Sequence, residues 1–295
     1  MALTLCAVPV QRGNAQSNTD FEGVLTTLVT IAGVDISVLS EGIDYTKNNR
    51  AEQVAELYKK IPPADLARMQ ATLQKEPLLG MALMILPPKG TLYVKGNATL
   101  AHAKGVGYEL YNYHNSDSDQ GILYMGSLVM PSEVITANYK PSQDLDSLFS
   151  KDKLITSDAF AIERTGKTET VAGYPCTISV YTPKSPAQVK NYKLRKLIVY
   201  TSKDMPKGIN FSHPYYLPED HGVLRIDAYM TDEDQPTAIY QITAVKKTAV
   251  SDDQLQPKKS QPVYSLTDMQ YGLKALAIMM GGLSALGSKN EDDEP

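Results

Sequence analysis

Alternation of apolar and polar residues dominates the chain between residues 90 and 247. Short runs of β-branched, aromatic and aliphatic residues follow one another there, and most are separated by glycine, proline, asparagine or aspartate. In Val223–Met230, four apolar residues share one face of an extended chain and two charged residues lie on the other. The pattern predicts one antiparallel meander of short strands. A strand or hairpin is also expected before it, at Phe21–Ile31 and Val34–Leu39.

The run Ile122–Met130 differs from its neighbours because both of its faces are apolar. Tyr124 and Leu128 fall on one face, while Leu123 and Met125 fall on the other. A strand that is apolar on both sides lies at the centre of a sheet or lines a cavity. This stretch is therefore the main candidate for a ligand-lining element.

Helical periodicity appears at about residues 50–76, which we expect to form an insertion of two helices. The first runs from Arg50 to Ile61 with Asn49 as its cap, because apolar residues recur there at helical spacing. Two prolines end it, and the second helix covers Ala64–Gln74. Each helix has an apolar face that must be buried against another element.

The carboxyl end returns to helix after a polar linker at residues 251–264. Residues 265–287 form the expected amphipathic helix, and 288–295 a disordered acidic tail. Spacings of four and three residues define an apolar seam, which we expect to be buried in the core; docking on a partner or a membrane surface is the alternative. The seam consists of Met269, Leu273, Leu276, Met280 and Leu283.

The amino terminus has the features of an export signal. Residues 1–15 combine an apolar run with small residues before Gln16, although no basic residue precedes the run. Cys6 would leave with this signal, so Cys176 would remain as a single thiol, which is typical of a small buried hydrophobe. The other strongly apolar run, Leu78–Leu86, is well short of the roughly 20 residues of a membrane span. We therefore expect an exported protein without a transmembrane span.

Composition narrows the function classes. The chain is 42% hydrophobic and 21% charged, which is typical of a globular protein, and its 295 residues suffice for a large core. A formal net charge of -4 with scattered basic residues argues against a nucleic-acid partner. The 18 tyrosines, against four phenylalanines and no tryptophan, suit half-buried strands.

The sequence contains none of the common catalytic or cofactor motifs. We find no nucleophile elbow, phosphate-binding loop, zinc-protease helix or dinucleotide fingerprint, so no cofactor is expected. An enzyme that uses Cys176 as its reactive group is the weakest of the three functional hypotheses that we consider; the other two, given below, are not enzymatic. In the loop Phe211–Gly222, acids and histidines crowd together at a spacing that matches no metal site, so we expect no metal there. The residues in question are His213, Glu219, Asp220 and His221.

Three short stretches resemble an uncharacterised family of bacterial exported proteins that is similar to the outer-membrane lipoprotein carrier (LolA-like) fold. They are Tyr93–Gly96 with the strands that follow it, the segment Gly166–Tyr181, and the strand Lys196–Ser202. Within the second, the family pattern is matched by Gly166, Val171, Gly173, Tyr174 and Cys176. The resemblance implies an α+β domain over residues 16–250, in which a curved antiparallel half-barrel packs against helices around an apolar cavity.

The resemblance and the residue patterns together lead to a hypothesis about function. The chain is expected to be a non-enzymatic module of the periplasm or cell surface of a Gram-negative-type bacterium that binds a lipid or another apolar small molecule. The second hypothesis is a structural or protein-interaction domain of the cell envelope with a closed core. The residues expected to line the cavity are Tyr124, Met125, Leu128 and Met130, with Tyr215 and Tyr216 at its mouth.

Overall fold

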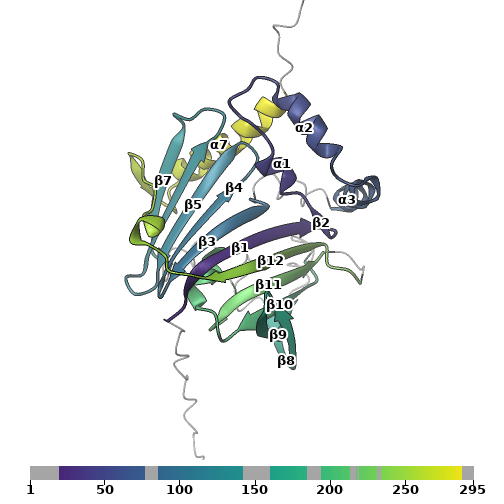
Figure 1. The fold of residues 1–295 in the computed structure, drawn as a ribbon, viewed down its shortest axis with the longest axis vertical. Coiled ribbons are helices and arrows are strands. Elements are labelled where there is room, and N and C mark those ends of the chain that lie inside the picture. The colour runs from purple at the N-terminus through teal and green to yellow at the C-terminus, as the bar shows by residue number, and fades with distance from the viewer. Residues whose placement is uncertain are drawn as a thin grey trace, which may run out of the picture.

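The structure, a computed structural model, describes residues 20–76, 86–141, 160–184, 194–212, 217, 219–230 and 234–287. These residues form one large sheet with few helices (Figure 1). The helices are α1 (Val38–Glu41), α2 (Arg50–Tyr58), α3 (Pro63–Lys75) and α7 (Met269–Gly287), with 3-10 helices η3 (Lys207–Ser212) and η4 (Asp252–Leu255). The strands are β1 (Glu22–Ile31), β2 (Val34–Asp35), β3 (Lys89–Lys95), β4 (Ala98–Lys104), β5 (Tyr108–Asn115), β6 (Gln120–Ser127), β7 (Val134–Tyr139), β8 (Phe160–Val171), β9 (Tyr174–Pro183), β10 (Lys196–Ser202), β11 (Gly222–Tyr229), β12 (Ala238–Lys247) and β13 (Val263–Ser265).

The described strands make a 13-stranded sheet in the order β13-β7-β6-β5-β4-β3-β1-β12-β11-β10-β9-β8, and β2 pairs with β1. The pairing of β13 with β7 is parallel, and the other pairings described are antiparallel. The sheet is open, with β13 and β8 at its edges, and it is not strongly curled. The fold is therefore mostly β and mixed, and the expected α+β half-barrel overstates both the helical share and the curvature.

The two faces of the sheet are covered by different parts of the chain. We call one the helix face, because α7 packs on it over β5–β7 and η3 packs on it over β3–β5. The other we call the strap face, because the strap, residues 248–262, crosses it and buries Val250 and Leu255 against Leu100. The main core lies on the helix face between β1, β3 and β9–β12, and includes Leu25, Leu92, Leu197, Val199, Leu224 and Ile226.

Most strands lie where the alternation predicts them. β11 is buried on both faces, with Leu224 and Ile226 on the predicted apolar face and Val223 and Asp227 on the other, so only Arg225 is partly exposed. The two-faced strand β6 pairs with both β5 and β7 and is an interior strand, although it lies nearer the β13 edge than the centre of the sheet. The sequence pattern misses β8, since most of this long edge strand is polar and exposed and it therefore has no apolar parity.

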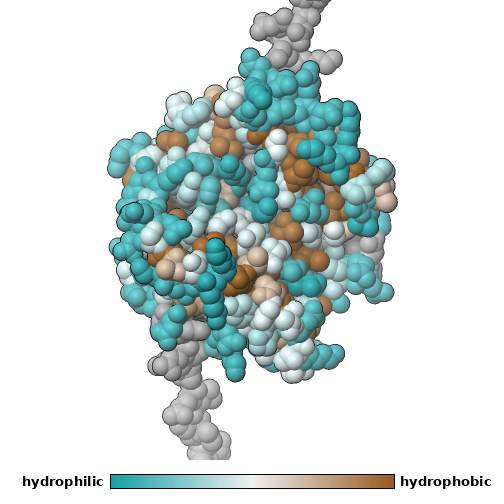
Figure 2. Space-filling view, viewed as in Figure 1, coloured by the Kyte–Doolittle hydropathy of each residue, from teal (hydrophilic) through white to brown (hydrophobic). Residues whose placement is uncertain are grey.

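The helical pair is also confirmed. α2 ends at Tyr58, shortly before Pro62-Pro63, and α3 begins at Pro63. Ile61 and Met69 are buried against Ile31 and Val34 at the end of the sheet. Seen from the side of Figure 1, the molecular surface is mostly hydrophilic, and apolar side chains gather near α1 and α3 (Figure 2). The two helices thus cover one end of the sheet, whereas η3 and the strap cover its centre.

The C-terminal helix is present, but its predicted orientation is wrong. Met269 and Leu273 are 77% and 60% exposed, so the 4-3-4 seam faces outward. Tyr271, Ala275 and Ile278 take the buried positions instead. Because α7 is apolar on nearly all sides, either side could pack on the sheet, and the side that carries the small Ala275 is the one that does. Among the described residues, no helix has both the length and the apolarity needed to cross a bilayer.

Candidate functional site

A cavity of about 270 Å³ lies on the helix face between the centre of the sheet and η3. Six adjacent strands contribute residues to it, namely β12, β1, β3, β4, β5 and β6. The lining consists of Thr27, Val29, Leu86, Pro87, Gly90, Leu92, Ala101, His102, Ala103, Leu110, Asn112, Leu123, Phe211, Ser212 and Tyr240. An open cavity at the sheet centre is thus part of the fold.

The cavity exists because small residues meet at its floor. Gly90 on β3 is paired with Ala103 on β4, and Leu92 is paired with Ala101. A Cβ atom added at Gly90 would come within 2.9 Å of Thr27 Oγ1, so this position holds only glycine without rearrangement. Larger aliphatic side chains on the flanking strands surround this floor and form apolar walls.

The roof of the cavity is η3, which is fixed to the sheet by hydrogen bonds. Asn112 Nδ2 donates to the carbonyl oxygen of Phe211 over 3.2 Å, and Tyr139 Oη donates to Asn112 Oδ1 over 2.6 Å. Ser212 Oγ lies 2.8 Å from Tyr240 Oη and donates to the carbonyl oxygen of Ile209. These polar groups of the lining therefore already bond one another, which leaves the apolar surface as the main contact for a ligand.

The lining carries no formal charge. Its described residues include no aspartate, glutamate, lysine or arginine, and the ring of His102 lies on the opposite face of the sheet, where it stacks on Tyr111. Burial raises the pKa of Tyr240, so its phenol stays protonated. A neutral cavity with apolar walls disfavours an ionised ligand and favours an uncharged apolar one.

The chemistry of the lining suits holding a ligand better than transforming it. The hydroxyl of Ser212 lies beside Tyr240, and a phenol whose pKa is raised by burial is not a base that could activate a serine. Cys176 lies 1% exposed in the main core, and burial raises the pKa of its thiol to about 11. A thiol with this pKa is protonated at neutral pH and is a poor nucleophile.

The structure separates the residues that the sequence grouped as ligand-lining. Met125 is on the helix face, buried beneath α7, whereas Tyr124 lies on the strap face with its ring edge against Tyr111. Leu128 and Met130 follow the end of β6, and Met130 is 43% exposed. None of the four is among the residues that line the cavity, although their neighbour Leu123 is. Tyr215 and Tyr216 lie outside the described residues.

A half-buried ion pair anchors the loop Phe211–Gly222 at Glu219, which is buried, whereas the side chain of its partner Arg164 is 55% exposed. Glu219, 4% exposed, accepts from Arg164 Nη1 at 2.6 and 2.8 Å, and it also accepts a hydrogen bond from Tyr181 Oη. Arg164 also donates to Ser179 Oγ at 2.8 Å. Sequence reasoning places Glu219 in a solvated loop and misses this role, because its partners lie on β8 and β9, far away in the sequence.

The same ion pair weighs against the metal site considered in this loop. Glu219 is committed to Arg164 and Tyr181, and His213 lies outside the described residues. No group of three or more potential metal ligands occurs within the described parts of the chain.

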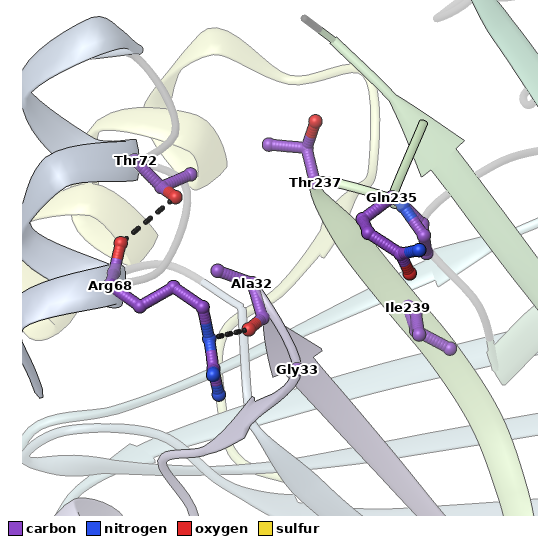
Figure 3. A pocket seen from close by; sticks show the side chains of 8 residues that line it. Ala32, Gly33, Arg68, Thr72, Gln235, Thr237 and Ile239 are labelled. Carbon is purple, nitrogen blue, oxygen red and sulfur yellow. Dashed lines mark hydrogen bonds between the residues drawn. The ribbon is translucent and has the colours of Figure 1, made fainter. Parts of the chain in front are cut away.

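A second hollow of about 420 Å³ lies between α3 and the turn that joins β1 to β2 (Figure 3). Among the described residues of its lining, Arg68 alone is charged; it donates from Nε to the carbonyl oxygen of Ala32 over 2.7 Å and from Nη2 to Asp65. Thr72 donates its hydroxyl to the carbonyl oxygen of Arg68. These bonds tie α3 to the sheet, and we regard this hollow as structural.

Comparison with protein families and with curated proteins gives no match. Among solved structures, the chain is distantly similar to PNGF-II, with 11% identity and a TM-score of 0.43 over 88% of this chain and 34% of that one. It thus spans about a third of the length of that protein. A weaker similarity is to MucB in complex with MucA(peri), with 13% identity and a TM-score of 0.29 over 58% of this chain and 54% of that one. Another is to a putative outer membrane lipoprotein-sorting protein domain from Vibrio parahaemolyticus, with 10% identity and a TM-score of 0.16 over 57% of this chain and 83% of that one. Similarities this distant assign neither a family nor a function.

Proposed function

We propose that this chain is a non-enzymatic, exported binding module that holds an uncharged apolar ligand in the cavity beneath η3. The observation that carries the proposal is the neutral cavity of about 270 Å³ with apolar walls and internally bonded polar groups. The signal-like residues 1–15 support a location in the periplasm or at the cell surface. The proposal does not depend on the half-barrel or on the resemblance to lipoprotein carriers, since an open sheet and η3 form the cavity.

The size of the cavity limits the ligand. An engineered apolar cavity of about 150 Å³ holds benzene, and ligand pockets of drug-sized molecules start at about 300 Å³. A volume of 270 Å³ therefore suits a two-ring molecule or one short stretch of an acyl chain. Each buried methylene would contribute about 0.8 kcal/mol, so modest affinity needs no strong polar contact.

Binding of 1-naphthylamine, a two-ring fluorophore that is uncharged at neutral pH, tests the proposal directly. We expect saturable binding to the full chain, and a loss of at least about tenfold in affinity in Ala103→Phe, which fills the floor of the cavity. The matched control is Lys104→Phe, since the next residue of β4 is exposed, and it should leave binding unchanged. Equal binding by the two variants, or no saturable binding by the native chain, would contradict the proposal.

The neutrality of the lining predicts a chemical preference. Decan-1-ol should displace the fluorophore more effectively than decanoate, because no cation in the lining compensates a carboxylate. Native mass spectrometry of protein purified from its own host without detergent, followed by organic extraction, would then identify the natural ligand. An excess of decanoate binding would show that the site has been misidentified.

A further inference from the structure

The C-terminal helix is apolar on two opposite sides, and the sheet uses only one of them. Tyr271, Ala275 and Ile278 are 5 to 6% exposed and pack on β5–β7. Four of the eight exposed large hydrophobic side chains among the described residues lie on the other side of this helix. We call these four the outer seam: Met269, Leu273, Leu276 and Met280, with exposures of 77, 60, 44 and 50%. Such a row of exposed apolar side chains is unusual on a monomer's surface.

The spacing of the outer seam matches the contact row of paired helices. The steps from Met269 to Met280 are four, three and four residues, which is the spacing of the a and d positions of a coiled coil. At 1.5 Å per residue the row is about 16 Å long and one residue wide. A narrow row of this kind fits one partner helix, whereas a helix that lies in a bilayer surface needs a broad apolar face flanked by basic residues.

The outer seam is complementary to itself. In the order Met, Leu, Leu, Met, both the residue types and the spacing read the same from either end of the helix. If two copies of α7 pack antiparallel around a two-fold axis, Met269 of one copy lies opposite Met280 of the other. Leu273 then lies opposite Leu276, so every layer of the contact pairs like with like.

No charge within α7 opposes this pairing, although the charged helix α2 also packs against α7. Lys274 is the only charged residue of α7, and it lies away from the seam, where its Nζ donates to Tyr264 Oη over 2.8 Å. A Cβ atom added at Gly272, beside the seam, would meet nothing within 4 Å, so a second helix can approach closely there. Met130 lies beside Gly281 and extends the apolar surface past the end of the row.

From these observations we propose that the chain forms a homodimer through antiparallel packing of two α7 helices along the outer seam. The contact is small compared with the roughly 1,600 Å² of a standard interface, so the dimer should be weak and dependent on concentration. The outer seam faces away from the sheet, whereas the ligand cavity lies beneath η3 and, among the described residues, meets the buried side of α7 only through Leu110 and Leu123. Dimerisation and ligand binding can therefore each fail without the other.

Sedimentation equilibrium of the full chain over a range of concentrations tests the proposal. We expect a monomer–dimer equilibrium whose dissociation constant rises at least about tenfold in Leu273→Glu and in Leu276→Lys. Both side chains are exposed, so circular dichroism and the melting temperature of the monomer should stay unchanged. The matched control is Ile162→Glu, a change of an exposed apolar residue on the edge strand β8, which should leave the dimer intact.

A mixture of the two variants tests the antiparallel register. The predicted two-fold axis places position 273 of one chain opposite position 276 of the other, so a mixed pair brings the introduced carboxylate against the introduced ammonium. Leu273→Glu chains mixed with Leu276→Lys chains should therefore recover dimerisation that neither variant shows alone. A native chain that stays monomeric, a dimer that resists both substitutions, or a mixture that does not recover would overturn the proposal. Loss of binding to phosphatidylcholine vesicles in Leu273→Glu, with a monomeric native chain, would assign the seam to a lipid surface instead.

Discussion

The two faces of the central strands show how one alternating sequence builds two different surfaces. On β4 and β5, Ala103 and Leu110 point to the helix face and line a neutral cavity. Their sequence neighbours, His102 and Glu109, lie on the strap face, where Glu109 also forms an ion pair with Lys258 of the strap. The helix face is roofed by a short 3-10 helix that leaves a hollow, whereas the strap face is covered by a chain segment that inserts a side chain.

This difference shows that the segment covering a face of the sheet determines whether a ligand cavity forms there. On the strap face, Lys258 Nζ lies 2.7 Å from Glu109 Oε1 and 4.2 Å from the centre of the Tyr111 ring. His102 stacks on the same ring at 4.1 Å. That face therefore adds charged and aromatic contacts to the apolar cluster of Leu100, Val250 and Leu255, while the helix face relies more on apolar packing. The two faces should respond differently to substitution, pH and salt.

The largest expected effect is on the helix face. Met125→Ala removes a side chain that is 6% exposed and packed beneath α7, so we expect the free energy of unfolding to fall by about 2–4 kcal/mol. Urea titration followed by circular dichroism measures it. The comparison variant is Tyr124→Leu, one residue away on the strap face, where we expect a loss of about 1 kcal/mol or less. Equal losses would show that both faces are packed alike.

A fall in pH should also destabilise the protein mainly through the helix face. His114 is 3% exposed, with its ring stacked 3.7 Å from that of Phe211, and burial lowers its pKa to about 4. The unfolded chain binds a proton near pH 6.5 and the folded chain does not, so stability is lost as the pH falls from about 6.5 towards 4. We expect a loss of about 3 kcal/mol over this range.

Urea titrations at several pH values check this prediction, with His114→Gln as the variant that should flatten the dependence. The matched variant is His102→Gln on the strap face. Burial lowers the pKa of His102 as well, but the nearby Glu109 carboxylate opposes the shift, so this substitution should change the pH dependence less. A larger change in His102→Gln than in His114→Gln would reverse the assignment of the two faces.

The sequence predicts most of the strands, although not the polar edge strand β8, and it predicts which side chains of β11 share a face, because alternation alone determines the face on which a side chain lies. It does not predict what covers that face. The cavity depends on small residues of adjacent strands, Gly90 beside Ala103, whose pairing follows from the register rather than from either strand. A glycine and alanines inside strands are the available signal for this cavity, whereas the bulky Tyr124 lies on the strap face.

The orientation of α7 is unpredictable for a related reason. The helix offers two apolar rows, and helical periodicity identifies both without ranking them. Which row is buried depends on the shape of β5–β7, where Ala275 allows a close approach. The edge strand β8 leaves no signal because neither of its faces is buried along most of its length.

The smallest expected effect concerns the side chain that fills the strap face. Lys258→Met keeps most of the aliphatic chain but removes the contact with Glu109 and the cation–π contact with Tyr111, whose ring lies 4.2 Å away. Because Lys258 is 44% exposed, we expect a loss of only about 0.5–1 kcal/mol, which salt should reduce further. A double-mutant cycle with Glu109→Gln, measured by urea titration at low and high salt, separates the ionic part. A loss as large as that of Met125→Ala would mean that the strap face, too, depends on buried packing rather than on charge, and the contrast between the faces would then lie only in the cavity.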